Sequence, residues 1–238
     1  MEASYGEYLN YKSEPVSSEA SLFRPDKIVT VPYYNRLRQL MVNYFPLYQG
    51  SSLLDGGCGL GRLTYDAGVL GHFVVGVDIS RPFIQFCKKL SGTDSPLEVE
   101  ISKVGQYSRK AFLTVPDRYK YVSCEFVIGD LLGLAFSDKS FSYVVSSSVL
   151  DRVRNPHQAV QEIHRILCKK GRAIVTSPLD WRMEFTPQVE WWIKSLLELF
   201  SPNKWNILLH EDQLEYCLRI SDRYLEHYLC EVVVVEKL

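Results

Sequence analysis

The chain has 238 residues and is nearly neutral, with 27 Lys and Arg against 28 Asp and Glu, for a formal net charge of −1. A protein specialised for nucleic acid usually carries a basic excess that neutralises phosphates, so this balance argues against a nucleic-acid partner. The composition, 46% hydrophobic and 23% charged, is that of an ordinary globular protein that can bury a core, which excludes wholesale disorder.

The amino-terminal residues and the cysteines indicate where in the cell the protein is expected to lie. Residues 1–10 lack a basic head followed by an apolar stretch, so no secretory signal is expected. The longest aliphatic run, residues 232–235, is far too short to span a bilayer. The 6 cysteines include no C-x-x-C pair, which argues against a zinc site and a small disulfide scaffold. We therefore expect a cytoplasmic protein with no membrane association and no bound metal.

The order of the expected elements predicts the fold class. Residues 1–30 are polar and are expected to form a loosely attached N-terminal arm. Apolar residues that recur on one face predict a helix over 33–45. The elements expected next are a strand ending at 53–54, a helix over 62–70, a strand over 73–77, a helix over 82–90, strands over 121–128 and 143–145, a helix over 156–167 and a strand over 173–176. This alternation predicts an α/β fold, Rossmann-like, with a mostly parallel sheet and helices on both faces.

The C-terminal part follows a different pattern. A helix is expected over 188–200, followed by strand-rich segments over 205–209, 214–220 and 228–236. A turn near Ser221 and Asp222 would make the last strands an antiparallel hairpin at the sheet edge. We expect residues 31–238 to form a single domain, with the polar stretch 91–120 as an insertion or cap near the active site.

The most informative segment is the loop after the first strand, Leu53-Leu54-Asp55-Gly56-Gly57-Cys58-Gly59-Leu60-Gly61-Arg62. A dinucleotide-binding loop has the spacing G-x-G-x-x-G, whose third position is Arg62 here. The glycines instead follow the acidic Asp55 as D-x-G-x-G-x-G. This pattern resembles the first motif of S-adenosylmethionine-dependent class I methyltransferases, in which the loop packs against the amino-acid moiety of the sulfonium cofactor.

Two further carboxylates follow strands at suitable spacing. Asp78 ends the second strand, 23 residues after Asp55, where a carboxylate can accept both ribose hydroxyl hydrogens. NAD-binding proteins place an acid similarly, so Asp78 alone does not discriminate. Asp130 follows the third strand, where the methyltransferases that it resembles keep an Asp that accepts a hydrogen bond from the adenine amino group. The alternative is that all three are turn or helix-cap residues.

The resemblance implies a set of residues that bind S-adenosylmethionine. The end of the fourth strand adds Ser146 or Ser147, one of which is expected to face the cofactor. The full set is Asp55, Gly57, Cys58, Gly59, Arg62, Asp78, Ile79, Asp130, Leu131, Ser146 and Ser147. Many small-molecule methyltransferases keep a histidine where Arg152 stands, and a permanent cation removes that obvious general base. Arg152 is either a solvated helix arginine or a substrate contact.

A narrower resemblance begins after the fifth strand. Residues 176–187, with the sequence TSPLDWRMEFTP, together with residues 150–153, Trp191 and residues 216–224, resemble the C-terminal methyltransferase domain of ovothiol-biosynthesis proteins. In that family the domain is fused to a sulfoxide synthase and methylates an imidazole nitrogen of a thiol-bearing histidine. This sequence contains no synthase module, and residues 7–12 are only a faint counterpart of the family's N-terminal motif. The resemblance thus implies a small-molecule acceptor and a possible separate sulfoxide synthase partner.

The substrate-side candidates are Arg152, Asp180 and Trp181. A carboxylate there can orient an amino-bearing substrate, and Trp181 can stack on a flat ring. Taken singly, Trp181 is equally a core aromatic that anchors the loop, and Asp180 a helix start.

Three functions remain open from the sequence. The first is a methyltransferase for the nitrogen of an imidazole or amine, which needs no base because the acceptor has a free lone pair. The second is a methyltransferase for another small acceptor, such as a hydroxyl or thiol. The third is an inactive protein that binds the cofactor and serves as a partner.

Overall fold

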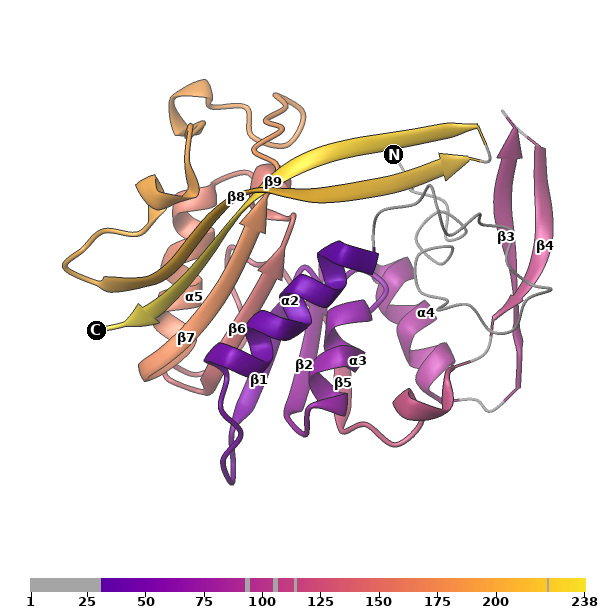
Figure 1. Ribbon diagram of the computed structural model, residues 1–238, viewed down its shortest axis with the longest axis horizontal. Coiled ribbons are helices and arrows are strands. Elements are labelled where there is room, and N and C mark those ends of the chain that lie inside the picture. The colour runs from indigo at the N-terminus through magenta and orange to yellow at the C-terminus, as the bar shows by residue number, and fades with distance from the viewer. Residues whose placement is uncertain (1–30, 93–94, 105–106, 114, 222) are drawn as a thin grey trace.

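The computed structural model describes residues 31–92, 95–104, 107–113, 115–221 and 223–238 (Figure 1). The N-terminal arm expected over residues 1–30 lies outside these described residues.

A seven-stranded sheet forms the centre of the fold. Its strands are β1 (Ser52–Gly56), β2 (Phe73–Asp78), β5 (Cys124–Ile128), β6 (Phe141–Ser147), β7 (Leu167–Ser177), β8 (Trp205–Ser221) and β9 (Tyr224–Lys237). Their order is β5-β2-β1-β6-β7-β9-β8, and the first five are mutually parallel. Strand β9 runs antiparallel to both β7 and β8. The predicted α/β fold, with its mostly parallel sheet and antiparallel C-terminal hairpin, is confirmed.

Helices cover both faces of this sheet (Figure 1). Alternate residues of each strand point to opposite faces, so Leu53 packs with α2 (Val31–Tyr44) and α3 (Arg62–Val69), whereas Leu54 packs with α5 (Pro156–Ile166). A further helix, α4 (Arg81–Ser91), packs beside α3. Both α4 and α5 begin with a side-chain cap and a proline in the first turn, signals that the sequence shows.

The polar stretch between α4 and β5 forms its own two-stranded sheet. Strands β3 (Leu97–Val104) and β4 (Tyr107–Leu113) pair as an antiparallel hairpin, followed by the short 3-10 helix η2 (Asp117–Tyr119). Leu97 and Val99 are buried while Glu98 and Glu100 are exposed, which is the alternation of a strand with one covered face. Strand β3 lies against β8 (Figure 1).

The helix expected over 188–200 is wrong. Two 3-10 helices stand there, η4 (Val189–Trp191) and η5 (Leu196–Leu199). Between them Ser195 is extended, with φ −147°, and forms a capping box with Glu198 that starts η5 anew. The expected strand over 121–128 also begins later, at Cys124, the first residue that pairs with β2.

The distal half of the C-terminal hairpin leaves the sheet. The last pair between β7 and β9 is Ser177 with Glu231, so residues 224–230 pair only with β8. A register shift between Glu211 and Leu214 in β8 marks the same point. We call residues 214–221 and 224–230 the arm, which is distinct from the N-terminal arm expected over residues 1–30. In Figure 1 the arm extends past the ends of the parallel strands toward β3 and β4.

Candidate cofactor and acceptor site

The glycine-rich loop after β1 needs its glycines. Gly57, Gly59 and Gly61 have φ of 77°, 52° and 79°, in the left-handed region that favours glycine. A Cβ on Gly57 would lie 2.7 Å from a methyl of Val149, and one on Gly61 would lie 2.6 Å from the ring of Phe126. The loop therefore holds its backbone close to neighbouring elements in a way that other residues cannot.

Asp78 fastens this loop to the end of β2. Its Oδ2 accepts a hydrogen bond of 2.8 Å from the Gly59 N–H, and its Oδ1 accepts one of 2.8 Å from the Ser80 N–H. Burial raises the pKa of Asp78, and the two backbone N–H groups partly offset that rise. Each carboxylate oxygen keeps a second lone pair, so Asp78 can still accept the hydrogens of two vicinal hydroxyls.

A small hollow opens between the loop, α2 and β6. Its lining consists of Tyr34, Asp55, Gly57, Cys58, Arg62, Leu63 and Ser147. Asp55 accepts a hydrogen bond of 2.7 Å from Thr64, and Arg62 pairs with Asp66 at 2.9 Å while its guanidinium lies 5.3 Å from the Tyr34 ring centre. A carboxylate and a guanidinium thus border one hollow, which suits the zwitterionic amino-acid end of S-adenosylmethionine.

The ends of β2 and β5 carry the residues expected at the adenine. The Gly129 N–H donates to the Asp78 carbonyl at 3.0 Å, which holds the two strand ends together. Asp130 is exposed and accepts a 2.9 Å hydrogen bond at Oδ1 from the Leu132 N–H, as a turn residue does. Beside these carboxylates Ile79 is 71% exposed, an apolar side chain on which a flat base can rest.

Of the two serines expected at the end of β6, only Ser147 lines the hollow. The Ser146 side chain is fully buried, and its hydroxyl has no hydrogen-bond partner among the described residues. The Ser147 hydroxyl lies 2.8 Å from that of Tyr33, which also contacts the hydroxyls of Ser148 at 3.0 Å and Thr176 at 2.6 Å. The sequence did not indicate Tyr33, which holds these hydroxyls, or its neighbour Tyr34, which lines the hollow.

The structure brings Arg152 and Asp180 into one ion pair. Arg152 lies at the end of η3 (Leu150–Arg152), and its Nη2 donates to Asp180 Oδ2 at 2.8 Å while its Nη1 donates to the Asp180 carbonyl at 2.6 Å. Arg182 pairs with the same Oδ2 at 2.9 Å. Although burial alone would raise the pKa of Asp180, these two guanidinium groups hold it below its usual range.

Asp151 forms a buried layer behind this pair. Its Oδ1 accepts a 3.1 Å bond from Ser177, and its Oδ2 lies 3.0 Å from the Arg152 guanidinium. Burial raises the pKa of Asp151, and the neighbouring Arg152 cation opposes that rise. The acceptor end of the site is therefore a set of paired charges, with no free carboxylate at Asp151 or Asp180.

Trp181 anchors the loop that follows β7. Its indole N–H donates to the Ile193 carbonyl at 2.9 Å, and its ring packs against the core on the α5 face of the sheet. The stacking role expected for Trp181 stays a prediction.

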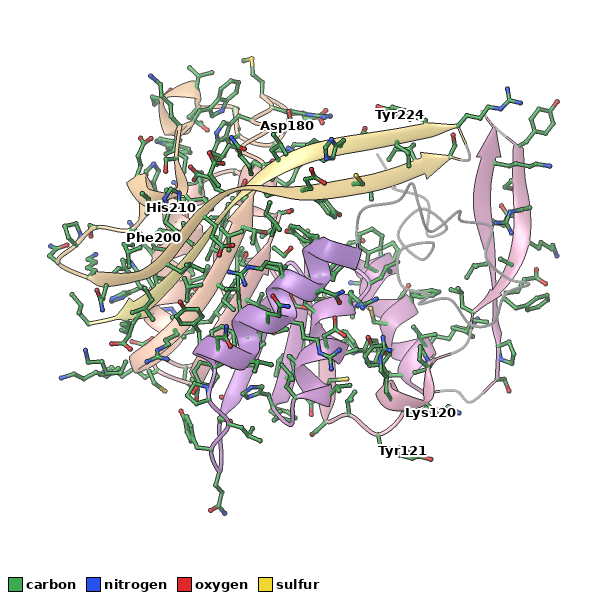
Figure 2. All side chains as sticks on the ribbon, in the orientation of Figure 1. Lys120, Tyr121, Asp180, Phe200, His210 and Tyr224 are labelled. Atoms are coloured by element: carbon green, nitrogen blue, oxygen red, sulfur yellow. The ribbon has the colours of Figure 1, made fainter. Side chains whose placement is uncertain are left out.

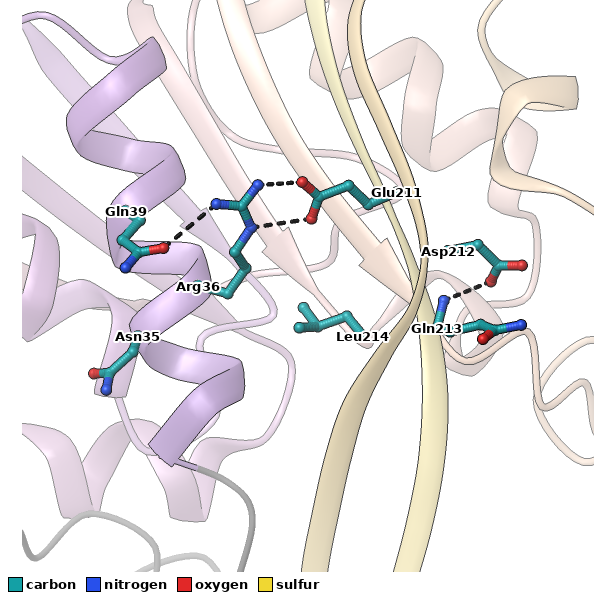
Figure 3. A pocket seen from close by; sticks show the side chains of 7 residues that line it. All are labelled: Asn35, Arg36, Gln39, Glu211, Asp212, Gln213 and Leu214. Atoms are coloured by element: carbon teal, nitrogen blue, oxygen red, sulfur yellow. Dashed lines mark hydrogen bonds and ion pairs between the residues drawn. The ribbon is translucent and has the colours of Figure 1, made fainter.

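A wider, polar groove lies on the outer side of α2 (Figure 3). Asn35, Arg36 and Gln39 of α2 face residues 211–214 of β8 across it. The Arg36 guanidinium makes a two-pronged ion pair with Glu211, which ties the helix to the base of the arm. The groove carries none of the residues expected to bind the cofactor.

The strand order is that of a class I methyltransferase. Residues 54–175, about half of the chain, match a family model described as a methyltransferase domain, and the chain belongs to this family. Membership of this family implies S-adenosylmethionine as the methyl donor. The described residues contain no helix able to span a membrane and no group of three or more side chains placed to hold a metal ion.

Solved structures share the fold at low identity. A SAM-dependent methyltransferase from Methanosarcina mazei is 18% identical, with a TM-score of 0.58 over 84% of this chain and 97% of that one. A protein from Pyrococcus horikoshii OT3 is 20% identical, with a TM-score of 0.54 over 86% and 91%. The cyclase SpnF is 18% identical, with a TM-score of 0.56 over 85% and 81%. Because a cyclase shares the fold, the fold alone does not define the reaction.

One curated relative is described as an uncharacterised protein. It is a 37.1 kDa protein in transposon TN4556 of Streptomyces fradiae, 25% identical over 160 residues. The match covers 66% of this chain, and the chain spans only 38% of the length of that relative.

Proposed function

We propose that the chain transfers the methyl group of S-adenosylmethionine to a ring nitrogen of a small, histidine-derived acceptor that carries a thiol. The observation that supports a nitrogen acceptor is the mutual pairing of Asp151, Arg152, Asp180 and Arg182 on the substrate side. Arg152 and Arg182 share Asp180, and Arg152 also contacts the buried Asp151. The 5 histidines of the chain lie outside this set, at positions 72, 157, 164, 210 and 227.

An acceptor with a free lone pair suits such a site. S-adenosylmethionine supplies a methyl carbon that the lone pair attacks in line as the carbon–sulfur bond breaks. The chain then has to position the two reactants, which can lower the barrier by about 7–11 kcal/mol without proton transfer. Arg62 and Asp55 at the hollow would hold the amino-acid end of the cofactor, and Asp78 the ribose. Ser147, held in place by the buried Tyr33 hydroxyl, would set where the acceptor ring meets the methyl group.

A second candidate is a methyltransferase for another small nitrogen, oxygen or sulfur acceptor. Its support is Asp151, whose raised pKa and hydrogen bond to Ser177 suit a group that takes up a proton. A third candidate is a catalytically inactive S-adenosylmethionine-binding partner protein.

The narrower resemblance extends the proposal to partners and to the substrate side. We propose that a separate sulfoxide synthase supplies the thiol-bearing acceptor. The hairpin of β3 and β4 would cover the acceptor.

Two measurements test this function. Calorimetry should show S-adenosylmethionine binding to the native chain, lost in Asp78→Ala and retained in Asp212→Ala, a control at an exposed position on β8. Incubation with 4-mercaptohistidine and S-adenosylmethionine should give a product heavier by one methyl group, placed on a ring nitrogen by its fragmentation in mass spectrometry. Methylation on sulfur or oxygen would favour the second candidate, and cofactor binding without turnover on any acceptor would favour the third.

A further inference from the structure

The arm has two distinct faces. Alternate residues of β9 share a face, and Tyr224, Glu226, Tyr228 and Cys230 stand on one of them. Cys230 at its base is fully buried. The opposite face of β9 carries Leu225, His227 and Leu229, all exposed. We call the first face the inner face and the second the outer face.

The inner face looks onto the ends of β6 and β7. Tyr216, the β8 partner of Tyr228, packs its ring 4.6 Å from that of Tyr33. The ring of Tyr228 is stacked on that of Tyr216, with centres 6.2 Å apart and planes 27° apart. Tyr228 also lies in the electrostatic field of Asp180 and Arg152. Figure 2 shows Tyr224 at the far end of the arm and Asp180 near the opposite end. The inner face is therefore a wall of the acceptor space.

Glu226 is the only carboxylate that β9 places on this wall, and its partners are neutral. Its Oε1 accepts a 3.0 Å bond from the Tyr224 hydroxyl, and its Oε2 accepts a 2.5 Å bond from the Tyr228 hydroxyl. Asp180, by contrast, has two arginines. Within the described part of the chain, Glu226 makes no ion pair with a lysine, arginine or histidine.

Glu226 is half-buried beside the rings of Tyr224 and Tyr228, and it lacks the direct ion pair that a buried carboxylate usually has. A cation that docks there gains an ion pair with Glu226 and the electron-rich faces of the rings, which attract cations within about 6 Å. The two phenol hydroxyls hold the carboxylate in one orientation, so little side-chain freedom is lost when the cation binds.

We infer that Glu226, with the rings of Tyr224 and Tyr228, binds a positively charged amino group of the acceptor. The inference rests on the proposed function and narrows its acceptor class to small amines that carry an ammonium group beside the methylated atom. Glu226 is then the residue that selects for charge, and the arm is the element that determines the acceptor.

A binding experiment tests this without turnover. The chain is labelled with 3-fluorotyrosine and saturated with S-adenosylhomocysteine, and the fluorine resonance of Tyr228 is assigned as the one lost in Tyr228→Phe. Histamine, which joins an imidazole ring to an ammonium group, should shift this resonance saturably. Imidazole-4-acetate, with a carboxylate in place of the ammonium, should bind at least tenfold more weakly.

Two matched variants complete the test. Glu226→Gln keeps the size of the side chain and its ability to form hydrogen bonds but removes the charge. It should lower the affinity for histamine at least tenfold. Glu215→Gln makes the same change at an exposed position on the outer face and should leave histamine affinity unchanged. Equal affinity for the two probes, equal affinity in native chain and Glu226→Gln, or no histamine binding at all would each overturn the inference.

The turnover assay separates this inference from the proposed function. If 4-mercaptohistidine is methylated, Glu226→Gln should raise KM at least tenfold and change kcat by less than threefold, with S-adenosylmethionine affinity unchanged. An unchanged KM would overturn the inference while the function stands. If no methylation occurs but histamine binds through Glu226, the function fails and the cation site stands.

Discussion

Replacing Tyr33 by phenylalanine is expected to lower the free energy of unfolding by about 1–3 kcal/mol. The Tyr33 side chain is fully buried, and its hydroxyl lies 2.6, 2.8 and 3.0 Å from those of Thr176, Ser147 and Ser148. A phenol hydroxyl donates once and accepts twice, so all three contacts can be hydrogen bonds together. Thr176 and Ser147 are 3.4 Å apart and can pair when the phenol is gone, so the loss should stay below the sum of three bonds.

Urea unfolding followed by circular dichroism measures this loss directly, and the melting temperature should fall by about 2–4 °C for each kcal/mol in a chain of this size. Tyr121→Phe is the matched control, because Tyr121 is 94% exposed and its loss should change stability by no more than about 0.5 kcal/mol. If Tyr33→Phe is as stable as this control, the hydroxyl cluster does not hold α2 to the strand ends, and the reasoning fails.

Four further predictions concern the glycine-rich loop, the cofactor carboxylate Asp78 and the C-terminus. Gly61→Ala should destabilise the fold by about 1–3 kcal/mol in urea unfolding, because its Cβ would lie 2.6 Å from Phe126 at a φ of 79°, whereas Gly133→Ala, with open space, should be nearly neutral. Asp78→Asn should weaken S-adenosylmethionine at least about 30-fold in calorimetry, since an amide group must face the Gly59 or Ser80 N–H. Because burial raises the pKa of Asp78 above 3.8, and because the ionised form accepts the hydrogen bonds, native affinity should fall as the pH drops through that raised value; a pH-independent affinity would contradict this. Lys237→Met should cost about 1–3 kcal/mol, because the buried ammonium donates to the carbonyls of His164 and Leu167 at 2.6 and 2.7 Å, and an unchanged urea midpoint would refute that role.

The parallel part of the fold could be predicted because its signals are local. Strand β1 and the loop after it form one continuous segment, and the glycines occupy positions whose φ requires them. The hairpin turn expected near Ser221 lies there, because β8 ends at Ser221 and β9 begins at Tyr224. Asp78 stands at the end of β2 as expected, since a strand end places its side chain at the edge of the sheet.

The segment after β7 could not be predicted, because tertiary contacts decide its conformation. Apolar residues recur at helical spacing from Val189 onward, which favours a helix by pattern alone. In the structure, the indole N–H of Trp192 donates to the Thr186 carbonyl, and the carboxylate of Glu231 in β9 accepts from the Leu196 N–H. These contacts hold an irregular path with two short turns, and no local pattern indicates them.

The inner face of the arm was even less predictable from the sequence. Tyr33 contacts residues more than 100 positions away in the sequence. The ring of Tyr216, which packs against it, comes from the part of β8 that lies beyond the last pair between β7 and β9. The composition of the tail shows tyrosines and glutamates, but only the register of the arm places Glu226 and Tyr228 on one face.

The cofactor end and the acceptor end are built in different ways, which explains how one fold can serve several reactions. The cofactor end is built from strand ends and a glycine-rich loop, whose backbone groups keep their positions when exposed side chains change. The acceptor end is built from side chains on α2, the loop after β7 and the arm, three elements that meet only in space. Substitutions on the arm can therefore alter the acceptor without disturbing the contacts of Asp78 with the loop. The Arg152–Asp180 ion pair places a permanent cation and its counter-ion on the substrate side, which fits a site that relies on the position of its acceptor.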